Sequence, residues 1–123
     1  MIKKVSVADA VSQLTDAWMP HRLGAVNDTE IKVARLDGDF VWHAHPDTDE
    51  LFFVLEGAME MDLEDGAVPL GPGEMLVVPR GVSHRPRAPG GCVVLLVEAS
   101  GTINTGDAPR GALTRDTIPD LSR

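Results

Sequence analysis

Short apolar runs separated by strong turn signals occupy most of this chain from about residue 25 onward. Turn residues interrupt the apolar pattern at intervals of roughly 8 to 12 residues, a spacing typical of short strands joined by turns. The clearest signals are Asp37-Gly38, Asp65-Gly66, Gly71-Pro72-Gly73 and Pro89-Gly90-Gly91. The β-rich runs between turns are EIKVARL, FVWHAH, ELFFVLE, AMEMDLE, EMLVVP, HRPRA and CVVLLVEA. The pattern predicts an all-β fold, either an antiparallel sandwich or a barrel.

The length of 123 residues favours a single domain over residues 1–123. Within it we expect the β core at about residues 25–100 and a short N-terminal helix at about residues 6–18. Apolar residues recur at helical spacing in VADAVSQL, and Ser6 is a suitable N-cap. Residues 101–123 form a polar tail rich in glycine and proline. We expect this tail to wrap the surface or to fray.

Acidic side chains exceed basic ones. Nineteen Asp and Glu against eleven Lys and Arg give a net charge of −8, which repels polyanions, so we expect no nucleic acid partner. No apolar run approaches the length needed to cross a bilayer, and the opening MIKKVSVADAVSQL does not have the pattern of a signal peptide. The single cysteine, Cys92, has no second cysteine to pair with. We therefore expect a cytoplasmic protein without membrane association.

Several predicted strands are apolar on both faces. If Phe52 and Val54 point inward, then Leu51, Phe53 and Leu55 point outward and also need cover. A partner subunit can supply it, so we predict a homodimer with sheet faces packed together. The alternative is that the N-terminal helix and the tail suffice. The residues expected in the core are Phe52, Val54, Met59, Met61 and Met75.

The stretch WHAHPDTDELFFVLEG carries a candidate metal site. His43 and His45 are two residues apart on a predicted strand, so both imidazoles project from one face. The loop PDTD has hairpin length, which brings Glu50 opposite His45 on the next strand. If the chain folds into a barrel, His84 can reach the same point from a neighbouring strand. Three imidazoles and one carboxylate suit a divalent transition metal, with Fe, Ni, Cu, Zn and Mn all compatible.

The residues around this candidate site resemble a known family. Gly38 to Gly57, with its His-x-His and Glu at set spacing, is similar to the first motif of the cupin superfamily, and Gly73 to His84 is similar to the second. Gly38 lies one residue closer to the histidines than is usual, and Ala88 stands where the second motif often ends in asparagine. Asn27 to Phe53 most resembles small single-domain bacterial cupins of the cupin_2 type, often described as mannose-6-phosphate isomerase-like.

The resemblance implies a double-stranded β-helix, also called a jelly-roll barrel, that is commonly dimeric and has a pocket inside. It also implies that His43, His45, Glu50 and His84 are the metal ligands, with one divalent metal per chain, Fe, Mn, Ni or Zn. We expect an enzyme acting on a small carbonyl- or carboxylate-bearing metabolite at the metal, such as a dioxygenase, an isomerase or a decarboxylase. The alternatives are a small-molecule binding or sensing protein without turnover, and a purely structural metal. The sequence identifies no catalytic acid or base.

Four other polar or aromatic residues receive less specific interpretations. His21 lies outside any predicted strand pairing and is expected at the surface or as a cap. Cys92 begins the most apolar strand and is expected to be buried and unreactive. Trp42 alternates away from the histidines and is expected to pack. Turn chemistry explains Asp49, although a hydrogen bond to a ligating histidine is an alternative.

Three arginines, Arg80, Arg85 and Arg87, lie close to His84 in the sequence. An arginine beside a metal can bind a carboxylate or phosphate of a substrate. We favour the simpler interpretation, in which all three are exposed at a sheet edge.

Overall fold

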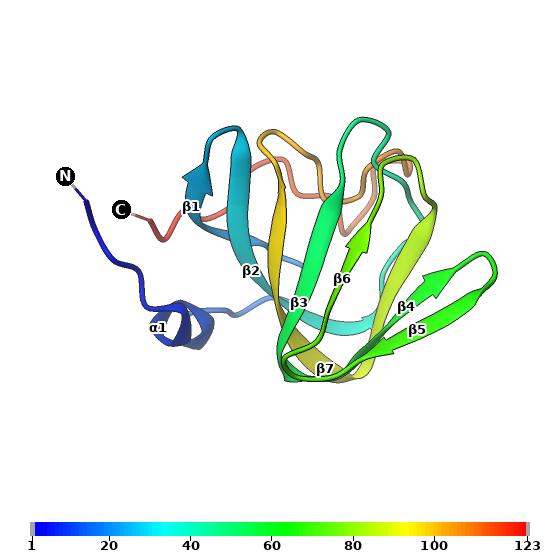
Figure 1. Ribbon diagram of the computed structural model, residues 1–123, viewed down its shortest axis with the longest axis horizontal. Coiled ribbons are helices and arrows are strands. Elements are labelled where there is room, and N and C mark those ends of the chain that lie inside the picture. The colour runs from blue at the N-terminus through cyan, green and yellow to red at the C-terminus, as the bar shows by residue number, and fades with distance from the viewer. Residues whose placement is uncertain (1, 123) are drawn as a thin grey trace.

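The computed structural model describes residues 2–122, which form one curved antiparallel sheet with a short helix outside it (Figure 1). The elements are α1 (Val7–Ser12), β1 (His21–Val26), β2 (Thr29–Asp39), β3 (Glu50–Gly57), β4 (Met59–Leu63), β5 (Gly66–Leu70), β6 (Met75–Val78) and β7 (His84–Ala99). The strand order is β1-β2-β7-β3-β6, and β4 pairs with both β5 and β7. The all-β prediction with one short helix is confirmed.

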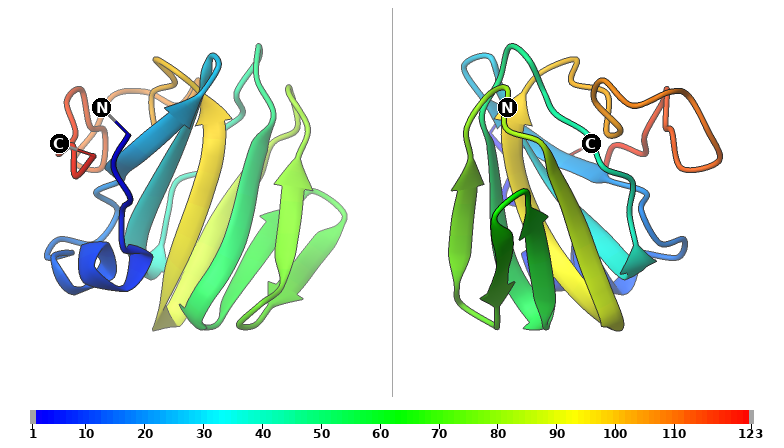
Figure 2. Two further views of the ribbon diagram at one scale, coloured as in Figure 1. Left: turned by 60° about the vertical axis from the view of Figure 1, so that its left-hand side comes forward. Right: turned by 90° about the vertical axis from the view of Figure 1, so that its right-hand side faces the viewer.

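Strand β7 carries the chain around the bend of the sheet. Its first half pairs with β4 and its second half with β3, while β2 pairs along both halves. The expected turn at Pro89-Gly90-Gly91 is therefore wrong, because the two runs on either side of it form one continuous strand. Gly91 has φ +85° here, and a Cβ on Gly57 would lie 2.4 Å from the Gly91 carbonyl oxygen. This close approach lets the sheet fold over on itself (Figure 2).

The run FVWHAH differs from its prediction. Residues 40–45 follow an irregular path, joined to the sheet by an isolated bridge between His43 and His84. Strands β1 and β5 were not expected. Strand β1 carries few large apolar residues and contains a register shift between Arg22 and Gly24, and β5 contains Pro69. Each of the two strands pairs with only one neighbour, so neither needs the apolar pattern of a central strand.

Helix α1 is shorter than expected, ending at Ser12 instead of residue 18. Its N-cap is Ser6, whose hydroxyl oxygen accepts from the Asp9 backbone N–H. Beyond the helix, Trp18 N–H donates to the Arg35 carbonyl at 2.8 Å, which places this segment beside β2. Within residues 2–122, no helix is long and apolar enough to cross a membrane.

The interior of the barrel is filled by alternate residues of the strands. Of the expected core residues, Phe52, Val54, Met59 and Met61 are buried. Met75 is not, since 53 % of its surface is exposed. The expectation for Met75 was wrong because Met75 pairs with Phe53 on the outward face of the sheet, whereas Leu76 pairs with the buried Phe52.

A second apolar cluster lies outside the barrel, under α1. Ala10 of the helix packs with Leu23 and Val33 of the first two strands, and Leu55 and Leu95 border them. The helix therefore covers only part of the outer face.

The C-terminal segment wraps back along the barrel instead of fraying. Leu121 N–H bonds to the Arg22 carbonyl and Arg22 N–H bonds to the Pro119 carbonyl. The Arg115 side chain donates to the carbonyl oxygens of Ala17 and Trp18. These contacts join the tail to the start of the chain, and both ends lie on the same side of the molecule (Figure 1).

Candidate metal centre

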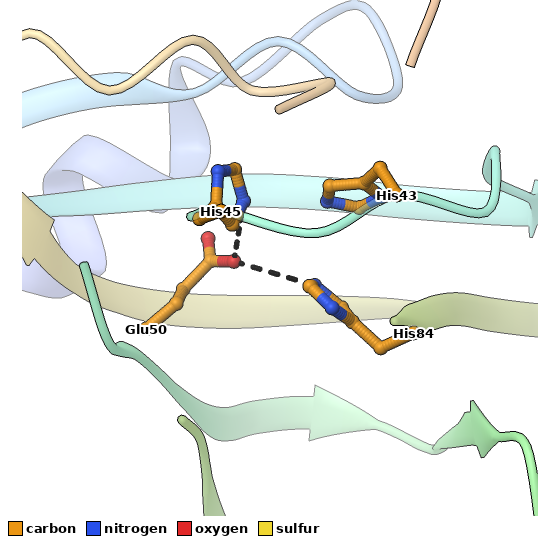
Figure 3. Close-up of side chains that lie close together, drawn as sticks. All are labelled: His43, His45, Glu50 and His84. Atoms are coloured by element: carbon orange, nitrogen blue, oxygen red, sulfur yellow. Dashed lines mark ion pairs between the residues drawn. The ribbon is translucent and has the colours of Figure 1, made fainter. Parts of the chain in front are cut away.

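The four residues expected at a metal site come together inside the barrel (Figure 3). They are His43, His45, Glu50 and His84, and one ligand atom from each lies within 4.8 Å of the others. All four side chains are buried, with His84 fully inaccessible. Glu50 is the first residue of β3 and His84 is the first residue of β7, so both stand at strand ends that the sheet holds in place.

Backbone hydrogen bonds fix the positions of the histidines. His43 N–H donates to the His84 carbonyl at 3.0 Å, and His84 N–H donates to the His43 carbonyl at 2.9 Å. The His45 carbonyl accepts from Gly81 N–H at 2.9 Å. Residues from the two sequence motifs are thus paired directly with each other, which places the imidazoles at one point despite their separation in the chain.

The orientation of two imidazoles is set by local carbonyls. His43 Nδ1 lies 2.9 Å from the Val41 carbonyl oxygen, and His84 Nδ1 lies 2.9 Å from that of Val82. A carbonyl only accepts, so in each ring Nδ1 carries the proton and the Nε2 lone pair remains free to bind a metal. Burial, followed by the nearby His84 imidazole, lowers the pKa of His43 to about 4. The His43 imidazole is therefore neutral at neutral pH, as a metal ligand must be.

The chemistry of the donor atoms fits a metal. His45 Nε2, Glu50 Oε1 and His84 Nε2 are buried and have no hydrogen-bond partner within the described part of the chain. His45 Nε2 and His84 Nε2 lie 3.2 and 3.7 Å from Glu50 Oε1. Buried polar atoms without partners are costly and rare, and here three of them point at one another. A cation bound between them would satisfy all three.

The Glu50 carboxyl is held in its ionised form. Burial would raise its pKa, but polar contacts with His45, His84 and Glu98 outweigh burial and lower the pKa below its usual range. The cluster therefore offers imidazole nitrogens and a charged oxygen, the donor set that suits divalent transition metals.

Two residues next to Glu50 were missed by the sequence analysis. Glu98 lies opposite Glu50 in the β3–β7 register, and Lys32 Nζ lies 3.0 Å from Glu98 Oε1. Both new side chains are buried. Burial, and then the charge of Glu50, raises the pKa of Glu98 to about 9. The two carboxyls hold one proton and one negative charge at neutral pH, and Lys32 balances that charge.

The burial of Lys32 and Glu98 could have been predicted from their positions in the strands. Lys32 shares a strand face with Ala34 and Leu36, and Glu98 shares one with Val94, all of which are core residues. A charged residue on the inward face of an apolar strand indicates a buried polar partner.

A small cavity of about 30 Å³ borders the cluster. Its polar lining includes His43, Glu50 and Glu98, and its aromatic lining is Trp18, Phe40 and Phe52. The Trp18 and Phe40 rings stack with centroids 4.6 Å apart. Because one water needs roughly 10–15 Å³, this space admits only a small ligand group in the described conformation.

The three arginines lie away from the cluster. Arg80 is exposed and pairs with Asp49, whose carboxylate accepts the Arg80 backbone N–H at 2.9 Å instead of bonding to a histidine. Arg85 and Arg87 are only partly exposed, contrary to expectation, because both bind the buried Asp62 carboxylate. Hydrogen bonds from Arg87 and Arg85 lower the pKa of Asp62 to about 2.

His21 and Cys92 are buried, whereas Trp42 is partly exposed. His21 is buried in β1 opposite Val33, so the surface assignment was wrong; its Nδ1 donates to the Met19 carbonyl. Cys92 is buried as expected, and burial raises its thiol pKa to about 11. Trp42 is partly exposed, at 44 %, and packs under the Arg85 guanidinium, 5.5 Å from the ring centroid.

The fold and the cluster together define a β-barrel protein whose interior can hold a metal. The sequence matches the cupin domain family (Cupin_2) over residues 34–98. Protein YdbB of Bacillus subtilis (strain 168) is 40% identical over 99 residues, covering 80% of this chain and 88% of YdbB. The chain therefore belongs to the cupin family.

Two solved protein structures have the same fold as this chain. A cupin-2 domain containing protein from Shewanella frigidimarina superposes with a TM-score of 0.76 at 37% identity, over 77% of this chain and 93% of that one. Protein NMB1881 from Neisseria meningitidis superposes with a TM-score of 0.73 at 33% identity, over 80% of this chain and 100% of that one. These similarities support the jelly-roll barrel expected from the motifs.

Proposed function

We propose that this cupin holds one divalent transition metal per chain through His43, His45, Glu50 and His84, with Fe, Mn, Ni and Zn as the candidates. We further propose that it is an enzyme acting on a small carbonyl- or carboxylate-bearing metabolite. The observation that carries the proposal is the set of three buried ligand atoms that lack hydrogen-bond partners within residues 2–122 and face one another. Such a set is costly without a cation.

The charge of the site supports the substrate class. Three neutral imidazoles and one carboxylate leave a divalent cation with a net positive charge, so a bound metal would act as a Lewis acid toward a carbonyl or carboxylate oxygen. Glu50, His43 and the aromatic wall of Phe40 and Phe52 border the space where that oxygen and the adjoining carbons would sit. Reaction subclasses compatible with this site are a dioxygenase, an isomerase and a decarboxylase. The resemblance to mannose-6-phosphate isomerase-like cupins supports an evolutionary relationship and does not by itself support isomerase activity.

We also propose that the protein is a homodimer. Met75 and Val77 on the outer face of β6 are exposed at 53 % and 48 %, and Leu51 and Phe53 beside them on β3 are only partly covered. Helix α1 covers the other part of this face. A second copy packed on β3 and β6 would bury the uncovered part. The acidic net charge of −8 supports small molecules and protein, not nucleic acid, as partners.

Elemental analysis tests the metal proposal. The protein is purified without chelator, alongside His84→Ala and, as a matched control, His21→Ala, which removes the one histidine outside the cluster. We expect about one equivalent of a transition metal in the wild type and in His21→Ala, and none in His84→Ala. Absence of metal from the wild type even after incubation with Fe(II), Mn(II), Ni(II) and Zn(II) would contradict the proposal. The identity of the metal then decides which activity is assayed first, oxygen-dependent turnover or isomerisation.

A further inference from the structure

The segment carrying two of the proposed ligands is held on both sides. Its His43 backbone groups pair with His84, and its His45 carbonyl accepts from Gly81. Ala44, between them, faces the opposite way, toward the C-terminal tail. Ala44 N–H donates to Asp107 Oδ1 at 2.7 Å, and the Ala44 carbonyl accepts from Asp107 N–H at 3.0 Å. Asp107 thus satisfies both backbone groups of the residue between the two histidines.

The contact is close enough to demand glycine beside Asp107. Gly106 has φ +54°, and a Cβ there would lie 2.3 Å from the Ala44 carbonyl oxygen and 3.0 Å from His43 Cδ2. Any side chain at this position would push against the ligand segment and against the imidazole itself. The tail therefore packs directly on the metal-ligand segment.

The tail turn that presents Asp107 is itself anchored. Thr105 is 2 % exposed, and its hydroxyl lies 3.1 Å from that of Thr114. The Asn104 side chain donates to the Leu113 carbonyl and accepts from the Arg115 N–H. Arg115 in turn bonds to the carbonyls that precede β1. These contacts tie the turn to the barrel, so Asp107 occupies a defined position.

We propose that Asp107 is a positioning residue of the metal centre, which fixes the Ala44 peptide groups and thereby the directions of the His43 and His45 imidazoles. Rotation of the Ala44 backbone would move both histidines. Residues that hold metal ligands in place commonly affect the affinity for the metal. Asp107 lies outside the matched cupin domain of residues 34–98. The inference rests on the proposed metal site for its effect on binding, but the fixing of Ala44 does not require a metal.

The test compares Asp107→Ala, which removes the acceptor, with Asp107→Asn, which retains an acceptor oxygen without the charge. Asp116→Ala is the matched control, since Asp116 is an exposed tail carboxylate paired with Arg110. Two properties are measured: Co(II) binding, by its visible absorption spectrum, and hydrogen exchange of the Ala44 amide in metal-free protein. We expect Asp107→Ala to weaken Co(II) binding by about 10- to 100-fold, with an altered spectrum and faster Ala44 exchange. Asp107→Asn and Asp116→Ala should stay close to wild type.

The two measurements distinguish failure of the Asp107 role from failure of the proposed metal site. If wild type binds Co(II) and Asp107→Ala matches it in affinity, spectrum and Ala44 exchange, Asp107 has no positioning role. An Asp107→Asn variant as impaired as Asp107→Ala would also overturn the inference, because charge and not the acceptor would then matter. If wild type binds no Co(II), the proposed metal site fails, and Ala44 exchange alone decides the role of Asp107. Gly106→Ala, expected to weaken Co(II) binding through its clash with Ala44, supplies an independent variant should Asp107→Ala fold poorly.

Discussion

Glu98 lies directly opposite Glu50 across the β3–β7 pairing, and both carboxyls are buried inside the barrel. Burial, and then the charge of Glu50, raises the pKa of Glu98 to about 9, because two such groups cannot both ionise without cost. Polar contacts with His45, His84 and Glu98 outweigh burial and lower the pKa of Glu50. Lys32 is the cation that balances the remaining charge, 3.0 Å from Glu98. The candidate metal centre therefore extends at least two residues beyond its four ligands.

Replacing Lys32 should show how strongly this arrangement depends on its cation. Lys32→Met leaves the carboxyl pair uncompensated, and we expect the free energy of unfolding to fall by about 3–5 kcal/mol. Lys32→Met combined with Glu98→Leu removes both members of the buried Lys32–Glu98 contact and should recover most of the loss. Urea unfolding of the metal-free proteins measures both. Equal stability of the single variant and the wild type would show that Lys32 does not compensate the pair.

The fold was predictable from local sequence because turn residues and β-rich runs alternate along the chain. Most of the expected runs, such as ELFFVLE and AMEMDLE, became strands. The turn at Pro89-Gly90-Gly91 failed because a glycine pair permits a bend within a strand as readily as a turn between two. The burial of His21 and the path of the wrapped tail could not be predicted for a different reason. Their positions depend on contacts between distant parts of the chain, such as Arg22 with Pro119, which leave no local pattern.

The candidate site was partly predictable for the same reason. Only a short loop separates His43 and His45 from Glu50, so the three side chains stay close even though residues 40–45 follow an irregular path and Glu50 does not pair with His45. His84 followed from the barrel closure that the motifs imply. Glu98 and Lys32 required knowledge of strand register, and the pairing of Asp107 with Ala44 spans most of the barrel sequence. Predicting such contacts needs the three-dimensional arrangement itself.

Metal binding should raise the stability of the protein. A metal bound only by the folded state adds about 2.7 kcal/mol to the free energy of unfolding at a free concentration 100-fold above its Kd. We expect this gain in the wild type and in His21→Ala, but not in His84→Ala. Urea unfolding with and without added metal measures it. A comparable gain in His84→Ala would place the stabilising metal elsewhere on the chain.

Cys92 gives a prediction that depends on pH. Burial raises its thiol pKa to about 11, so the thiol is protonated at pH 8 and becomes reactive only as the pH rises toward 11. At pH 8 the folded protein should contain roughly 200-fold less thiolate than the unfolded chain, in which the pKa is about 8.5. Alkylation by iodoacetamide should therefore be far slower before unfolding in urea than after it, and should accelerate steadily with pH. Equal rates in the two states would show that Cys92 is accessible.

The proposed dimer predicts a difference between two exposed valines. Val77 lies on the uncovered face of β6 with 48 % exposure, and Val68 lies on β5, which pairs only with β4, with 37 % exposure. We expect the wild type to have twice the chain mass of 13.2 kDa in solution. Val77→Lys places a charge in the proposed interface and should produce monomers, because a charge without a partner is costly to bury. Val68→Lys, the matched control, should leave the dimer intact.

Light scattering coupled to gel filtration measures the masses. A monomeric wild type would overturn the dimer, and dissociation by Val68→Lys but not by Val77→Lys would move the interface to the β4–β5 hairpin.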